Sequence, residues 1–118
     1  MKKLIVLLFI LISTSFVNAQ VVSADSAQYF GDKIVSVKGK VMSTYETRGE
    51  KKSVVLNFGK PYPDQTFQVI IYEKDIYKFH TEPKEFFKDK DLIVRGKVNM
   101  VKGKPSITVI KPEQIVLQ

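Results

Sequence analysis

The stretch VVLNFGKPYPDQTFQVIIY, from Val54 to Tyr72, holds two short apolar runs on either side of a turn. Large apolar side chains recur at every second position, as Val54, Leu56 and Phe58 in the first run and as Phe67, Val69 and Ile71 in the second. This period of two predicts half-buried strands. Gly59 and two prolines separate the runs, and proline cannot donate a hydrogen bond to a ladder. We therefore expect two consecutive strands, over residues 54–58 and 66–72.

The residues before this pair predict one more, longer strand. Valines at positions 35, 37 and 41 share one parity with Gly39, and serine or lysine fills the positions between them. The alternation can continue as far as Tyr45. A glycine among charged residues in Thr47–Lys52 then interrupts it, as a hairpin connection does.

The residues after the pair predict a helical insert and two further strands. Aromatic and apolar side chains are irregularly spaced between Glu73 and Asp89, and Pro83 prevents one continuous helix, so we expect two short helical turns. Alternation resumes over Asp91–Val101, a tight turn follows, and Ser106–Ile110 supplies the fifth strand. Ile115, Val116 and Leu117 are expected to return to the core. Strands of this number and spacing predict an all-β fold, a small five-stranded barrel whose closure removes exposed edges.

Five segments of the chain resemble a known family: Val37-Lys-Gly-Lys-Val41, Leu56-Asn-Phe-Gly-Lys-Pro-Tyr-Pro63, Phe67-Gln-Val-Ile-Ile71, Leu92-Ile-Val-Arg-Gly-Lys-Val98 and Lys102-Gly-Lys-Pro-Ser-Ile107. They look like the small bacterial OB-fold domains grouped with the tRNA-anticodon-binding-like nucleic-acid-binding proteins. The resemblance covers Asp32 to Ile115 and implies an OB-fold domain over residues 32–118 that binds nucleic acid. An N-terminal segment, residues 20–31, would precede it with a short helix capped by Ser23. OB folds also bind oligosaccharides and proteins, so the fold alone does not choose the ligand.

The first 19 residues predict a signal peptide. Lys2 and Lys3 precede an unbroken apolar run, Leu4–Ile12, and a small residue, Ala19, stands before the expected cleavage point. The alternative is a membrane anchor, but the run is shorter than the roughly 20 residues needed to cross a bilayer. We therefore expect an exported protein, periplasmic or secreted, that does not span a membrane after cleavage. Its oligomeric state stays open.

Composition excludes several kinds of chemistry. The chain has no cysteine and a single histidine, His80, so an ordinary zinc site cannot be assembled. Asp89 and Asp91 lack further ligands, and no glycine-rich phosphate loop is present. We expect no enzyme activity and no cofactor, and a metal-dependent nuclease is a remote alternative. Cleavage would remove two of the 19 basic residues and none of the 12 acidic ones, so the mature chain stays basic, which favours anionic partners.

Binding single-stranded nucleic acid needs cations for phosphates and flat side chains for bases. In OB folds the loop after the first strand and the loop before the fifth flank the binding face, and we expect their cationic tips to stand together at one mouth. The candidate nucleic-acid-binding residues are Arg48, Lys51, Lys52, Asn57, Tyr62, Tyr72, Arg95, Lys97, Lys102 and Lys104. Tyr45 could also stack.

Each of these residues has a plain structural alternative. Lysines in turns keep loops soluble, and tyrosines at strand ends often pack half-buried. Asn57 points away from the apolar face of its strand, where it either contacts a ligand or, as we favour, bonds to the turn at Gly59–Tyr62. A second hypothesis gives the same barrel face to an envelope oligosaccharide or a protein partner.

Overall fold

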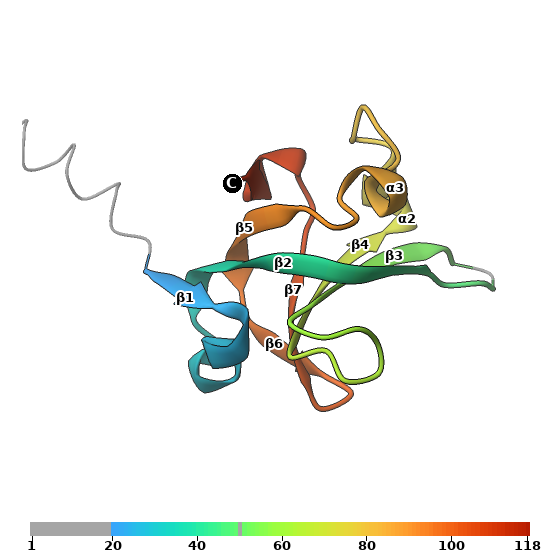
Figure 1. Ribbon diagram of the computed structural model, residues 1–118. Helices are drawn as coiled ribbons and strands as arrows, with labels where there is room; N and C mark the ends of the chain where they lie inside the picture. The colour runs from blue at the N-terminus through green and yellow to red at the C-terminus, as the bar shows by residue number, and fades with distance from the viewer. Residues whose placement is uncertain (1–19, 50) are drawn as a thin grey trace, which may run out of the picture.

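The structure, a computed structural model, describes residues 20–49 and 51–118. The predicted signal peptide, residues 1–19, lies outside the described residues. The fold is mostly β, with short helices between strands (Figure 1). The strands are β1 (Val21–Ser23), β2 (Ile34–Glu46), β3 (Ser53–Phe58), β4 (Phe67–Tyr72), β5 (Asp91–Lys97), β6 (Asn99–Val101), β7 (Lys104–Thr108) and β8 (Ile115–Leu117). The helices are η2 (Ala24–Phe30), α2 (Glu73–Ile76), α3 (Pro83–Phe86) and η3 (Pro112–Gln114).

The strands form one mixed sheet in the order β6-β7-β4-β3-β2-β5-β8, with β1 added beside β2. Most neighbours are antiparallel, but β1 is parallel to β2 and β7 is parallel to β4. The first half of β2 pairs with β5 and its second half pairs with β3. A register shift between Val41 and Ser43 marks the change. β2 thus connects two halves of the sheet (Figure 1).

The core lies on the face of the sheet predicted from the alternation. Five aliphatic side chains, one from each main strand, are completely buried: Val37, Leu56, Val69, Val94 and Ile107. Phe58 and Phe67 lie among them, with ring centroids 5.2 Å apart. The segment between β4 and β5 covers one side of this core, where Ile76, Phe79, Phe86 and Phe87 pack against it. The insert therefore completes the core rather than forming a separate unit.

The structure differs from the sequence prediction at three places. The expected fourth strand is two strands, because Val98 leaves the ladder: its amide donates to the Lys33 carbonyl, and its own carbonyl accepts from Asp32. Ile115–Leu117 forms an edge strand on β5 in which Val116 and Leu117 stay exposed, so the prediction that they return to the core is wrong. The short strand β1 was not predicted at all.

The central path β7-β4-β3-β2-β5 is OB-fold-like: a three-stranded meander, a helical insert and two further strands, of which β7 lies parallel to β4. Within residues 20–49 and 51–118, no ladder joins β5 to β7. In that same part of the chain, no helix has the length and apolar character that crossing a membrane requires.

Candidate nucleic-acid interface

The outer face of β2, β3, β4 and β7, opposite the core, carries a row of polar side chains. Register places Ser43 beside Asn57, Asn57 beside Gln68, and Gln68 beside Ser106. We call these four residues the polar row. The next row along the strands is Tyr45, Val55, Ile70 and Thr108. Side chains of neighbouring strands stand close together on one face, so each row is continuous across the sheet.

Hydrogen bonds link the members of the polar row in pairs. The Asn57 amide nitrogen donates to the Ser43 hydroxyl at 3.2 Å, and the Gln68 amide nitrogen donates to the Ser106 hydroxyl at 2.8 Å. Asn57, Gln68 and Ser106 are buried. Asn57 is therefore below the molecular surface and bonded to Ser43 of β2, not to the turn at Gly59–Tyr62 as expected; the turn itself bonds to Ser43.

The loop Gly59–Thr66, which we call the covering loop, lies over the polar row. The Tyr62 amide donates to the Ser43 hydroxyl at 3.3 Å, and the Gln65 side chain donates to that of Gln68 at 3.3 Å. Two side-chain oxygens, Asn57 Oδ1 and Gln65 Oε1, are buried without a hydrogen-bond partner in the described structure. Buried acceptors without partners are costly, so these two oxygens lower the stability of this layer.

The covering loop brings a second aromatic ring onto the outer face. The Tyr62 ring stacks on that of Tyr45, with centroids 6.4 Å apart and planes 9° apart. Both residues remain largely exposed, Tyr45 at 55% and Tyr62 at 70%. Tyr72, also exposed, ends β4 on the same face. Flat exposed rings are the groups on which bases stack.

Two hairpins that carry cations lie at the two ends of this face. Arg48, Lys51 and Lys52 belong to the β2–β3 hairpin, which lies beside the end of β4 because Ser53 is opposite Tyr72. Lys102 and Lys104 belong to the β6–β7 hairpin, which lies beside the beginning of β4 because Ser106 is opposite Gln68. Figure 1 shows the two hairpin tips pointing in different directions.

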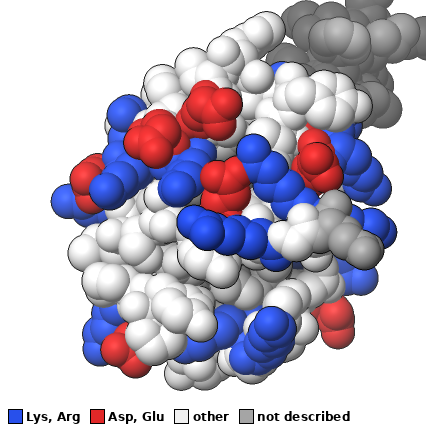
Figure 2. Space-filling view, turned by 90° about the vertical axis from the view of Figure 1, so that its right-hand side faces the viewer, with Lys and Arg blue, Asp and Glu red and all other residues white. Residues whose placement is uncertain are grey.

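The expectation that the two cationic tips share one mouth is therefore wrong. Its physical reason is the parallel pairing of β4 and β7, which sets the start of β7 at the end of the face far from the β2–β3 hairpin. The tips flank the face from opposite ends instead. In Figure 2, basic side chains with acidic ones among them cross the middle of the view and reappear near its lower edge, with mostly uncharged surface between the two groups.

Arg95 and Lys97 do not join the other candidates. They lie on β5, opposite Ser36 and Ile34 in the first half of β2. Their side chains are exposed on the outer face of the other half of the sheet, where Lys38 has the same parity. The ten candidates are thus divided between two surfaces, with the larger group around β3 and β4.

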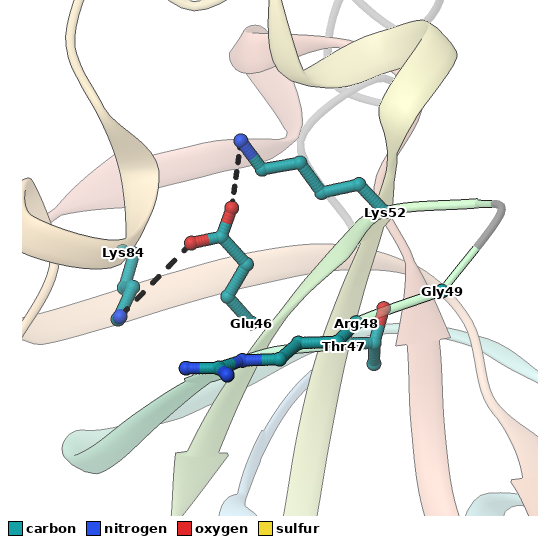
Figure 3. Close-up of a pocket in the computed structure, with 6 residues that line it drawn as sticks. All are labelled: Glu46, Thr47, Arg48, Gly49, Lys52 and Lys84. Atoms are coloured by element: carbon teal, nitrogen blue, oxygen red, sulfur yellow. Dashed lines mark ion pairs between the residues drawn. The ribbon is translucent and has the colours of Figure 1, made fainter.

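A hollow of about 390 Å³ lies at the base of the β2–β3 hairpin, and we call it the hairpin hollow. It is lined by Glu46, Thr47, Arg48, Gly49, Lys52 and Lys84 (Figure 3). The Glu46 carboxylate is 2.7 Å from the Lys52 ammonium and 4.0 Å from that of Lys84. Sequence reasoning found Arg48 and Lys52 but missed Lys84, because nothing in the spacing shows that α3 folds back onto this hairpin.

The described residues hold no group of three or more histidine, cysteine, aspartate or glutamate side chains placed to bind a metal ion. His80 is exposed in the segment between α2 and α3. The chemistry that the interface offers is therefore charge, hydrogen bonding and aromatic stacking.

No protein-family model matches the chain, and no curated protein matches it in sequence. One similar solved structure is a "putative aspartyl-tRNA synthetase" from Leishmania major Friedlin, with 17% identity and a TM-score of 0.48 over 85% of this chain and 21% of that chain. Another is a "putative nucleic acid-binding lipoprotein" from Klebsiella pneumoniae subsp. pneumoniae MGH 78578, with 10% identity and a TM-score of 0.47 over 89% of this chain and 96% of that chain. This chain thus spans about a fifth of the synthetase's length.

Proposed function

We propose that the chain is an exported, non-catalytic OB-fold module that binds single-stranded or irregular nucleic acid. In this proposal residues 1–19 direct export and are removed, and the five central strands act as a closed barrel. The observation that carries the proposal is the parallel stack of Tyr45 and Tyr62 between two hairpins at opposite ends of β4, each of which carries cations. The ligand then lies over the covering loop and runs between these two hairpins.

The chemistry of this surface suits a polymer with a charged backbone and flat bases. Each lysine or arginine that neutralises a phosphate releases a bound counterion, which favours binding at low salt. Stacking on a tyrosine accepts any base, because every base has a flat face. Since three of the four residues of the polar row are buried, few hydrogen-bonding groups remain to distinguish the bases. We therefore expect little sequence preference.

The test is fluorescence anisotropy with labelled single-stranded oligonucleotides at two salt concentrations. We expect measurable binding at low salt and weaker binding at high salt, with the logarithm of the association constant falling linearly with that of the salt concentration. The double variant Lys102→Gln/Lys104→Gln should bind more weakly and show a shallower salt slope. The matched control is Lys33→Gln/Lys111→Gln, which removes the same charge from exposed positions outside the interface.

Two results would overturn the proposal: no binding at low salt, or equal losses in the test and control variants. Binding to an uncharged oligosaccharide that does not change with salt would support the second hypothesis, an envelope glycan ligand. The tyrosine stack fits that ligand as well, because sugar rings also pack on aromatic faces.

A further inference from the structure

The hairpin hollow is separate from the stacking face. Tyr45 and Glu46 are successive residues of β2, and successive side chains of a strand point to opposite faces. Tyr45 lies on the outer face with Tyr62, so Glu46 points to the other side, toward α3. Figure 3 shows Glu46 between side chains from the β2–β3 hairpin and from α3. A ligand in this hollow would not be in the plane of the tyrosine stack.

The Glu46 carboxylate positions two ammonium groups. Its Oε1 atom is 2.7 Å from Lys52 Nζ, and its Oε2 atom is 4.0 Å from Lys84 Nζ. The two lysines therefore lie on different sides of one carboxylate. Lys84 is held in place by α3, whose Pro83 is buried and whose end packs on the core through Phe86 and Phe87.

The described lining carries more positive than negative charge. Arg48, Lys52 and Lys84 face a single carboxylate, so the lining has an excess of two positive charges. The Arg48 side chain extends alongside Glu46 toward the side where Lys84 lies (Figure 3). Arginine presents a planar set of donors that matches phosphate oxygens, and lysine adds a compact charge.

A phosphate monoester is the ligand whose charge matches this site. It carries about −1.5 to −2 charges at neutral pH and three strong acceptor oxygens, whereas a backbone phosphodiester carries a single charge. We propose that the hairpin hollow binds phosphate monoesters, with Arg48, Lys52 and Lys84 as the binding residues and Glu46 as the counter-ion that positions the two lysines. This goes beyond the proposed function, because the hollow is a second site whose ligand is the phosphate group itself. The monoester belongs either to the end of a nucleic-acid strand or to a free nucleotide.

The experiment is a titration followed by amide chemical shifts in two-dimensional NMR. The probes are a nucleoside 5′-monophosphate, the same nucleoside without phosphate, and a dinucleoside that contains only a phosphodiester. We expect the monophosphate to shift the amides of Glu46–Gly49, Lys52 and Lys84, the nucleoside to leave them unchanged, and the diester to bind at least about fivefold more weakly. Equal affinity for monoester and diester, or shifts confined to other residues, would overturn the inference.

Matched variants test the residues. Lys84→Gln is expected to weaken monophosphate binding by about fivefold or more, while Lys88→Gln, an exposed lysine just beyond α3, should leave it unchanged. Equal effects of the two substitutions would refute the assignment. The source of the monoester follows from oligonucleotides of one sequence with and without a 5′-phosphate. Tighter binding of the phosphorylated strand indicates a strand end, and equal binding of the two strands, with the mononucleotide still bound, indicates a free nucleotide.

The outcomes for the two sites are distinguishable. If only the inference about the hollow is wrong, the 5′-hydroxyl oligonucleotide still binds to the wild type, and Lys102→Gln/Lys104→Gln still weakens that binding. If only the proposed function is wrong, the 5′-hydroxyl oligonucleotide does not bind, but the mononucleotide still shifts the amide signals of the hollow.

Discussion

A β-carbon added to Gly96 on β5 would lie 2.6 Å from the Cγ2 atom of Ile107 on β7. Ile107 is completely buried, and its branched side chain has no free space to move into. These two strands share no ladder in the part of the chain that the structure describes, so their approach depends on side-chain packing. Glycine at position 96 is what permits this approach.

Replacing Gly96 by alanine should therefore destabilise the domain. We expect Gly96→Ala to lower the free energy of unfolding by about 1–3 kcal/mol, because the added methyl group overpacks the contact with Ile107. Urea denaturation followed by circular dichroism measures this change. The control is Gly31→Ala, since a β-carbon at Gly31 would meet nothing within 4 Å. Equal stability of the two variants would show that β5 and β7 can separate without cost.

The Tyr45–Tyr62 stack predicts a ring-dependent contribution to nucleic-acid binding. Tyr62→Ala should weaken binding of single-stranded oligonucleotides by about 1–3 kcal/mol, because it removes one stacking surface. Tyr62→Phe should keep most of the affinity, since it keeps the ring. Anisotropy titrations at one salt concentration compare the variants. Tyr29→Ala, at a tyrosine that is 78% exposed in η2, serves as control, and a similar loss there would show that Tyr62 has no special role.

The hydroxyl group of Thr47 is expected to stabilise the β2–β3 hairpin. Its oxygen accepts a hydrogen bond from the Ser53 amide at 2.9 Å and lies 2.9 Å from the Ser53 hydroxyl. Thr47→Val keeps the shape but loses these bonds, so the free energy of unfolding should fall by about 1 kcal/mol or somewhat more. Thr81→Val, at an exposed position between α2 and α3, should change it far less. Thermal and urea denaturation measure the change. Unchanged stability of Thr47→Val would show that the hydroxyl group does not stabilise the hairpin.

The ion pair of Lys78 with Asp75 is expected to make the stability of the domain fall at alkaline pH. A hydrogen bond to the Asp75 carboxylate, at 2.7 Å, raises the pKa of Lys78 above its ordinary value of 10.5. A group whose pKa is higher in the folded state stabilises that state while it is protonated, so the contribution is complete below pH 10.5 and is lost as the pH rises through the raised pKa. Lys78→Gln should lower stability at neutral pH and flatten the decline above pH 10.5.

The comparison for Lys78 is Lys74→Gln, at an exposed lysine on α2. Urea midpoints measured on both sides of pH 10.5 give the two profiles. Parallel profiles for wild type and Lys78→Gln would show that the ion pair with Asp75 does not contribute.

The strands and the core could be predicted from sequence because their signal is local. A period of two identifies which side chains face inward, and the completely buried aliphatic residues of β2, β3, β4, β5 and β7 follow it. β1 and the division at Val98 escaped prediction for the opposite reason. A strand of three residues is too short to show a period, and a backbone bond from Val98 to Lys33 leaves no trace in the pattern of side chains.

The arrangement of the interface depended on pairings that alternation does not show. The parallel register of β4 and β7 decides that Lys102 and Arg48 lie at opposite ends of the face. Asn57 is buried because the covering loop lies over it, and Lys84 lies next to Glu46 because α3 brings it there. Residue types could be chosen from sequence, whereas the residues that share a surface required the fold.

The length of β2 affects how the domain unfolds. Its 13 residues pair with β1 and β5 along one half and with β3 along the other, so both halves of the sheet rely on the same strand. Neither half can melt while the other keeps a complete set of neighbours, and cooperative all-or-none denaturation follows from this shared element. New chain ends made by circular permutation would accordingly be tolerated at the β2–β3 hairpin, but not inside β2.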